Sequence, residues 1–167
     1  LTSELPEELL DITNFILGEG VGLFKTDDGW SGNLTQLNPN KGYWFNVDNS
    51  ITFQYPQETT ILSKTYHPMD VYDGIPEEFH FFQSTQQSFY LINDIQLNNQ
   101  SIDSDDYVIL SYNNNELTGS GLYTGMNSTI VTMGKDITPG TEQFHQMGDT
   151  PTFKLYNKST DELIPLY

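Results

Sequence analysis

Short runs of aromatic and β-branched residues, each ended by a cluster of turn-forming residues, constrain this fold most strongly. In the second half of the chain they recur about every ten residues, a spacing typical of a β-sandwich or open barrel. The sequence contains no alanine, the best helix former, so long helices are disfavoured. We expect six or seven strands in such runs, at residues 78–82, 89–92, 95–97, 107–112, 117–123, 129–133 and 152–156.

The N-terminal part has a different pattern. Apolar residues recur at steps of three and four between residues 5 and 17, and Gly18 ends the run. This spacing predicts a helix of about three turns. A short strand over 21–24 follows, and the alternating runs 43–47 and 51–55 are predicted to pair as a hairpin.

These patterns predict a mainly β fold, with a small helix-plus-sheet module followed by a β-sandwich. We expect a helix and β-hairpin module over residues 1–57 and a β-sandwich module over 77–167. Between them, residues 58–76 are interrupted by Pro and Gly, so we predict a connection there.

The charge of the chain excludes several function classes. It carries 23 acidic and 6 basic side chains, a formal net charge of −17, and has no arginine. Because binding to phosphates needs clustered Lys and Arg, we expect no nucleic-acid partner. No run of about 18 apolar residues is present, so we expect no membrane insertion. Aromatic residues make up 13% of the chain, so it is not a disordered acidic segment.

Several motifs resemble a pair of β-rich modules found in secreted, multi-module surface proteins of marine and Bacteroidetes-like bacteria. In the first module, segments of the types IIGEGVA, GWxGxL and GKGYW follow one another. The matching segments here are residues 14–21 (NFILGEGV), 29–34 (GWSGNL) and 41–45 (KGYWF). The partner module is matched by residues 79–86, by Phe89 and Tyr90, by 104–106, by 133–136 and by 148–156.

The resemblance implies an extracellular or cell-surface location and motifs with structural roles. It also implies a strand ahead of the first helix, which this sequence does not include. That strand is removed, is supplied by another chain, or lies outside this sequence.

No catalytic motif stands out, and we predict that the chain is not an enzyme. The nucleophile elbow GxSxG and the phosphate-binding loops are absent. The histidines His67, His80 and His145 are far apart in sequence and show no zinc-ligand spacing.

Calcium is the strongest metal hypothesis, and we expect Ca²⁺ to be the only cofactor. Calcium takes six to eight oxygen ligands, many from Asp side chains in loops. Divalent ions would also relieve the self-repulsion of a charge of −17. The candidate ligands are the clustered Asp103, Asp105 and Asp106 together with Asp136 and Asp149 in later loops.

A second hypothesis is contact with carbohydrate through aromatic side chains. Trp30, Tyr43 and Trp44 lie close together in the sequence. Because side chains alternate along a strand, Tyr43 and Trp44 cannot both face the core. One of the two faces is therefore exposed, or is covered by a neighbouring module or subunit.

Four Asn-x-Ser/Thr sequons are candidate glycosylation sites in an extracellular protein. Their asparagines are Asn33, Asn99, Asn127 and Asn157.

Together, these observations favour a non-enzymatic extracellular module of a surface or fibre-forming protein. We expect it to serve adhesion or assembly through β-strand and aromatic contacts. Its partners would be copies of itself, neighbouring modules of a longer chain, or glycans. Two alternatives stay open: a carbohydrate-binding module of a secreted enzyme, and a virion surface or decoration protein.

Overall fold

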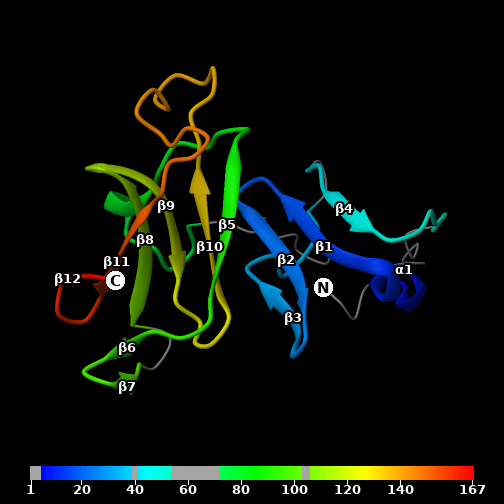
Figure 1. Cartoon of the computed structure of the whole chain (residues 1–167), viewed down its shortest axis with the longest axis horizontal. Helices are drawn as coiled ribbons and strands as arrows, with labels where there is room; N and C mark the ends of the chain where they lie inside the picture. Colours follow the sequence, from blue (N-terminus) through cyan, green and yellow to red (C-terminus); the bar gives the residue numbers. More distant parts are fainter. Residues whose placement is uncertain (1–4, 39–40, 54–71, 103–105) are drawn as a thin grey trace, which may run out of the picture.

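The computed structural model describes residues 5–38, 41–53, 72–102 and 106–167, and it confirms the mainly β fold. A sheet in the order β3-β2-β1-β4 forms the N-terminal module. The pair β10-β5 and the sheet β12-β11-β8-β9 form the sandwich module. Figure 1 shows β5 and β10 between the other two sheets.

The N-terminal module contains one short helix. It consists of α1 (Glu7–Ile12), β1 (Thr13–Gly18), β2 (Val21–Thr26), β3 (Gly29–Gly32) and β4 (Trp44–Val47). Six buried apolar residues form its core on the α1 side of the sheet, namely Leu5, Leu9, Ile16, Val21, Leu23 and Leu34.

The prediction of a three-turn helix is wrong after Ile12. The chain turns there into β1, the second strand of the sheet from its β4 edge, which pairs with β2 on one side and β4 on the other. The segment that begins at Thr13 is rich in β-branched and aromatic residues, and pairing on both sides satisfies its backbone groups. The Thr13 hydroxyl donates to the Leu9 carbonyl at 2.6 Å and so closes the helix end.

The predicted hairpin between 43–47 and 51–55 is also wrong. β4 pairs antiparallel with β1, and residues 51–53 are not in a strand. Residues 54 and 55 lie outside the described residues. The alternation within β4 does follow the prediction, because Phe45 packs on the core and Trp44 lies on the opposite side.

The sandwich contains the six strands expected between residues 89 and 156 and two more, whereas the run 78–82 forms no strand and begins within a 3-10 helix. Its strands are β5 (Gln87–Ile92), β6 (Gln96–Leu97), β7 (Gln100–Ser101), β8 (Tyr107–Asn113), β9 (Glu116–Leu122), β10 (Ser128–Met133), β11 (Thr152–Asn157) and β12 (Glu162–Pro165). The short strands β7 and β12 were not predicted. The β5-β10 pair packs over β8 and β11 around Ile109, Ile130 and Leu155, which are all fully buried.

Glycine allows β9 to lie very close to β10. A Cβ atom at Gly119 would come within 1.9 Å of the Val131 carbonyl oxygen. No other residue fits there without moving the backbone.

The far face of the β8 sheet is covered by a segment that includes the 3-10 helix η1 (Glu77–Phe79). Ile75 and Phe79 pack there against Val108 and Leu110. β8 is therefore buried on both faces. Residues 72–76 of the predicted connection belong to this covering segment, whereas residues 58–71 lie outside the described residues.

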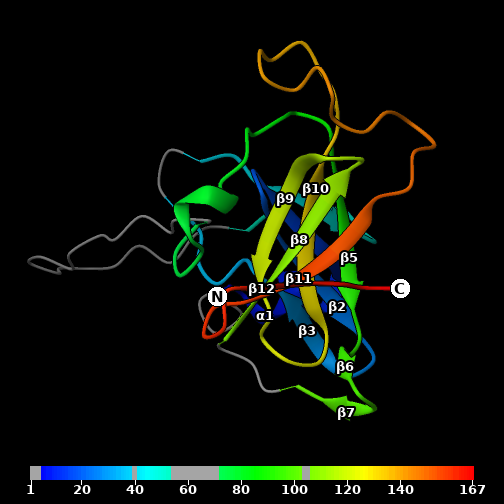
Figure 2. The same ribbon diagram turned by 90° about the vertical axis from the view of Figure 1, so that its left-hand side faces the viewer.

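Two irregular regions project from opposite ends of the sandwich. In Figures 1 and 2 the long connection between β10 and β11 extends beyond one end, and the β6-β7 hairpin lies at the other. The β10-β11 connection, which carries Asp136 and Asp149, is thus separated from the β6-β7 hairpin by the length of the sandwich.

Candidate functional site

The face of the N-terminal sheet that turns away from its core carries a row of aromatic rings. In the strand register Phe15 lies opposite Phe24, and Leu17 lies opposite Trp44. Phe89 of β5 continues the row: the Phe15 and Phe24 ring centroids are 6.1 Å apart, and those of Phe24 and Phe89 are 5.4 Å apart. We call Phe15, Phe24, Phe89 and Trp44 the aromatic strip.

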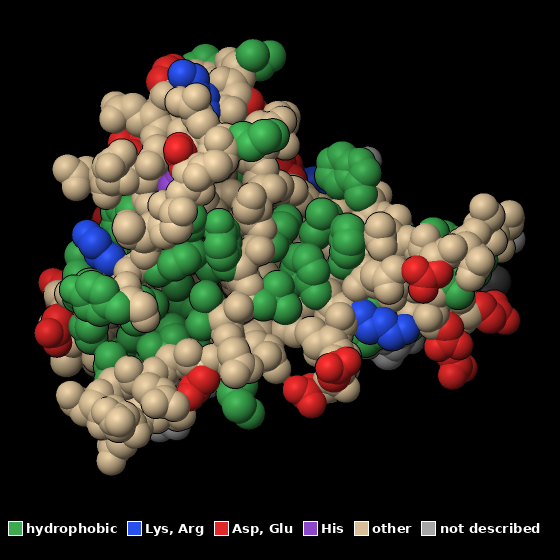
Figure 3. All heavy atoms as spheres, in the orientation of Figure 1, with side chains coloured by type: hydrophobic (Ala, Val, Ile, Leu, Met, Phe, Trp, Pro, Cys, Tyr) green, Lys and Arg blue, Asp and Glu red, His purple; other side chains and the backbone are tan. Residues whose placement is uncertain are grey.

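The strip is accessible from outside the protein. Trp44, at its β4 end, has 65% of its surface exposed, and the three phenylalanines are half-buried. Figure 3 shows hydrophobic side chains exposed where β5 lies beside the N-terminal sheet. The sandwich therefore covers only part of this face.

A glycine allows the two modules to meet within the strip. Gly22 lies beside the rings of Phe24 and Phe89, and a Cβ atom there would come within 2.8 Å of the first and 3.0 Å of the second. A side chain at this position would push the rings apart.

Polar side chains border the Trp44 end of the strip. The Asn14 side-chain amide donates to Asn46 Oδ1 at 3.1 Å and to Asp48 Oδ1 at 2.8 Å. A register shift between Thr13 and Phe15 lies at Asn14. All three polar side chains are exposed, and we call Asn14, Asn46 and Asp48 the polar rim.

The structure separates the three aromatic residues predicted to contact carbohydrate. Only Trp44 belongs to the strip. Tyr43 packs against the core, and its hydroxyl oxygen accepts the Asn38 backbone N–H at 2.8 Å. Trp30 lies on β3, at the opposite edge of the sheet from β4, and also packs against the core, with Lys25 Nζ 5.9 Å from its ring centroid. Sequence alone did not indicate that Phe89 contacts Phe24, because the two residues are far apart along the chain.

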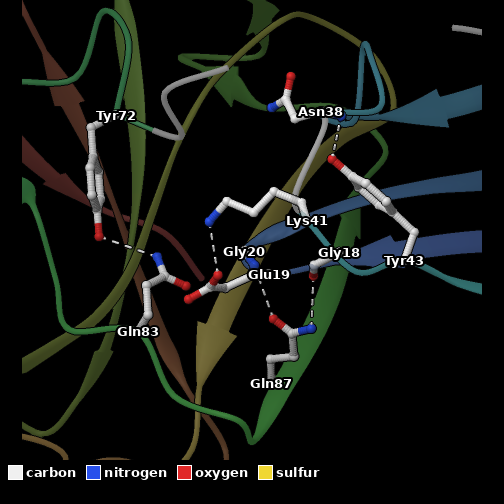
Figure 4. Close-up of polar contacts among 9 residues, drawn as sticks. All are labelled: Gly18, Glu19, Gly20, Asn38, Lys41, Tyr43, Tyr72, Gln83 and Gln87. Carbon is white, nitrogen blue, oxygen red and sulfur yellow. Dashed lines mark hydrogen bonds and ion pairs between the residues drawn. The ribbon is translucent and has the colours of Figure 1, made fainter. Parts of the chain in front are cut away.

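The two modules are joined beside the strip by the side chain of Gln87, at the start of β5. Its amide nitrogen donates to the Gly18 carbonyl at 3.0 Å, and its oxygen accepts the Gly20 N–H at 3.2 Å (Figure 4). The Ser31 hydroxyl adds a second link by donating to the Asn127 carbonyl at 2.5 Å.

Further polar contacts lie around the same β1-β2 turn. Glu19 forms an exposed ion pair with Lys41 at 3.1 Å, and Gln83 donates to the Tyr72 hydroxyl at 3.2 Å (Figure 4). The side-chain oxygen of Gln83 is buried without a hydrogen-bond partner among the described residues.

The predicted calcium ligands do not converge in the described part of the chain. Asp106 is exposed just before β8, whereas Asp136 and Asp149 lie at the other end of the sandwich, beside a cavity of about 590 Å³. Asp103 and Asp105 lie outside the described residues. No group of three or more His, Asp or Glu side chains suited to a metal ion occurs among the residues described. The calcium site stays a prediction.

Asp136 has a structural role that the sequence did not reveal. One carboxylate oxygen accepts the Thr85 N–H at 2.7 Å and the Thr85 hydroxyl at 2.8 Å, and the other accepts the Thr138 N–H at 2.7 Å and the Thr141 hydroxyl at 3.2 Å. These hydrogen bonds, led by the one from the Thr85 backbone, hold the pKa of Asp136 well below its usual range. The carboxylate ties the loop after β10 to the segment before β5.

The histidines have separate environments. His145 is 9% exposed and lines the same cavity as Asp136, and neither of its ring nitrogens has a hydrogen-bond partner among the described residues. Burial lowers its pKa, and the nearby charge of Asp149 partly opposes that shift. His80 stacks on Tyr72 with ring centroids 4.1 Å apart, and His67 lies outside the described residues.

The four sequons differ in how accessible their asparagines are. Asn99 is exposed in the β6-β7 turn. Asn33 is half-buried, and its side chain bonds to Gly20 and Gly22. Asn157 bonds to the turn after β11 and to Tyr107, and Asn127 is half-buried at the module junction. Of the four, Asn99 has the most accessible side chain for modification.

Comparisons with known proteins do not assign this site: no protein-family model, curated protein or solved structure matches the chain. The resemblance to bacterial surface modules therefore stays a prediction. Among the described residues, no helix has both the length and the apolar character needed to cross a membrane.

Proposed function

We propose that this chain is a non-catalytic adhesive module of an extracellular surface protein, and that its aromatic strip binds neutral glycans. The observation that carries the proposal is the position of Trp44. Trp44 is 65% exposed on the edge strand β4, two residues before Asn46 of the polar rim and on the sheet face that carries the phenylalanine rings.

The chemistry of this surface suits a sugar. Aromatic rings offer flat apolar faces on which the C–H face of a sugar ring can stack. Neighbouring amide and carboxylate groups can exchange hydrogen bonds with its hydroxyl groups. The net charge of −17 disfavours anionic glycans, so a neutral glycan is the expected partner.

A glycan array probed with the wild type and with Trp44→Ala tests this proposal. We expect binding to neutral glycans by the wild type and a loss of at least about tenfold in the variant, because a single exposed aromatic anchor often dominates a binding surface. Phe82→Ala is the matched control, because Phe82 is an aromatic residue of similar exposure, 62%, in the sandwich module. Equal binding by wild type and Trp44→Ala would refute the role of the strip.

A second candidate function is assembly by strand addition, which the free edge of β4 favours. β4 ends the N-terminal sheet, and no strand pairs with its outer edge among the described residues. An exposed edge can accept a strand from another chain.

Sedimentation velocity over a range of protein concentrations tests this candidate. If β4 drives assembly, polymers should form at physiological salt, where charges are screened beyond about 8 Å. Asn46→Lys places a charge on the edge strand and should prevent polymers, whereas Trp44→Ala leaves the backbone edge intact. A monomer at all concentrations would exclude strand addition.

A further inference from the structure

We infer that the glycan is a linear chain lying across both modules, and that Gln87 is the positioning residue that keeps the two parts of the aromatic strip in line. The inference rests on the proposed function, because it concerns the same surface. It goes further by specifying the shape of the ligand and a residue outside the strip on which recognition depends.

The strip is a row on a sheet face and not a pocket around one sugar. The rings of Phe15, Phe24 and Phe89 follow one another at 6.1 Å and 5.4 Å, similar steps of about the length of one sugar unit. A monosaccharide would cover one ring only. An extended oligosaccharide can place successive units on these three rings and extend toward the exposed Trp44 on β4.

The row is continuous only if the modules keep their relative position. Phe15, Phe24 and Trp44 belong to the N-terminal sheet, whereas Phe89 belongs to the sandwich. The contact between Phe24 and Phe89 therefore crosses the junction, and a small rotation of one module would break the row.

Gln87 is placed to prevent that rotation. It lies two residues before Phe89 on β5, so the two side chains leave the strand on the same side. Its amide bonds to both Gly18 and Gly20 of the β1-β2 turn (Figure 4). The bidentate contact fixes the β5 backbone that carries Phe89 relative to the sheet that carries Phe24. Gln87 is itself half-buried, which limits its own motion.

The polar rim makes the two ends of the row chemically different. Asn14, Asn46 and Asp48 lie at the β4 edge of the row, where Asn46 is opposite Phe15 in the strand register. We expect a short oligosaccharide to bind at this end, and only longer chains to reach Phe89. Affinity should then rise with chain length, and the part gained by length should depend on the junction.

The test measures affinity by isothermal titration calorimetry against cello- and manno-oligosaccharides, from disaccharide to hexasaccharide. For the wild type we expect affinity to increase with length. For Gln87→Ala we expect disaccharide affinity to stay unchanged and hexasaccharide affinity to fall about tenfold. Phe89→Leu, which keeps apolar bulk and removes the ring, should give the same result.

Two controls separate positioning from general damage. Gln86→Ala removes the neighbouring amide, whose side chain is exposed and lies beside Gly134 of the sandwich, and should behave as wild type. Trp44→Ala should weaken all lengths alike, since every oligosaccharide uses that end.

The outcomes distinguish this inference from the proposed function. An affinity for the wild type that does not depend on length, or an equal loss for disaccharide and hexasaccharide in Gln87→Ala, would overturn the inference and leave glycan binding in place. No binding of the wild type to these oligosaccharides or to any neutral glycan on the array would overturn the proposed function and the inference with it.

Discussion

The two modules bury their strands in different ways. In the sandwich, all six residues of β10 are buried, and so are four consecutive residues of β8, Val108 to Ser111. In the N-terminal sheet, the buried residues of β1 are Thr13, Ile16 and Gly18, with exposed or half-buried neighbours between them. The central sandwich strands β8 and β10 are thus covered on both sides, whereas the N-terminal sheet has one covered face and one open face.

This difference assigns separate roles to the modules. A strand covered on both faces has no surface left for a partner, but it is held rigidly by packing. An open face costs stability and leaves aromatic rings available for contact. In this protein the rigid module contributes Phe89 and Gln87 to the open face of the other. Variants that disturb each module can test this division.

The largest loss of stability is expected from Gly119→Ala in the sandwich. The added Cβ would lie 1.9 Å from the Val131 carbonyl oxygen, so the β9 and β10 backbones must separate. We expect a loss of about 3 kcal/mol or more in the free energy of unfolding, measured by urea denaturation with far-ultraviolet circular dichroism.

Gly42→Ala is the matched control, because among the described residues no atom beyond its chain neighbours would lie within 4 Å of a Cβ at this position. Its unfolding free energy should stay close to that of the wild type. A small effect of Gly119→Ala would show that the two layers can move apart easily, and would contradict the view of the sandwich as the rigid module.

The next prediction compares the loss of unfolding free energy caused by substitutions on the two faces of one strand, β1. Ile16 is fully buried in the N-terminal core, and Ile16→Ala should cost about 2–5 kcal/mol. Phe15, its neighbour, is half-buried on the open face, so Phe15→Ala should cost clearly less. Both tryptophans, Trp30 and Trp44, lie in this module, so tryptophan fluorescence during urea denaturation follows its unfolding alone. Equal losses would mean that the open face is also part of the core.

The sequence predicted what depends on neighbours along the chain. The alternation in β4 correctly separated Trp44 from Phe45, and the spacing of aromatic runs correctly located six of the eight strands of the sandwich, all but the short β7 and β12. The start of β1 was misassigned because its apolar residues fit a helical spacing as well as a strand. Tertiary pairing with β2 and β4 decided between the two.

The candidate site could not be predicted in the same way. Gln87 bonds to Gly20 and Gly18, which lie 67 and 69 positions earlier in the chain. No local sequence pattern indicates such a contact. Asp136 looked like a free metal ligand, yet its partner Thr85 lies 51 positions away. Sequence patterns placed Trp44 and Tyr43 on opposite faces without deciding which face is exposed, and the rings of the strip were found only from strand pairing and from the contact between the modules.

The smallest expected effect concerns His145, which lies in the sandwich module. Because burial lowers its pKa in the folded protein, the unfolded chain binds a proton more readily as the pH falls below about 6.5. Stability should therefore decrease from pH 7 to pH 5, with a slope from this residue of at most about 1.4 kcal/mol per pH unit. His145→Gln should flatten that slope in urea denaturation followed by far-ultraviolet circular dichroism.

Gln146→Ala is the control for this prediction, since Gln146 is exposed, follows His145 in the same loop and carries no titratable group, so the slope between pH 7 and pH 5 should stay as it is. Asp136 affects stability in a separate pH range, below that of His145. Its folded pKa is depressed, so its stabilising effect is complete above its unfolded pKa of about 3.9 and is lost as the pH falls below that value. An unchanged slope in His145→Gln would mean that the imidazole takes up its proton as easily in the folded state as in the unfolded one. The loop that covers it would then be open to water, and the end of the sandwich that carries the β10-β11 connection would be less rigid than the strands beneath it.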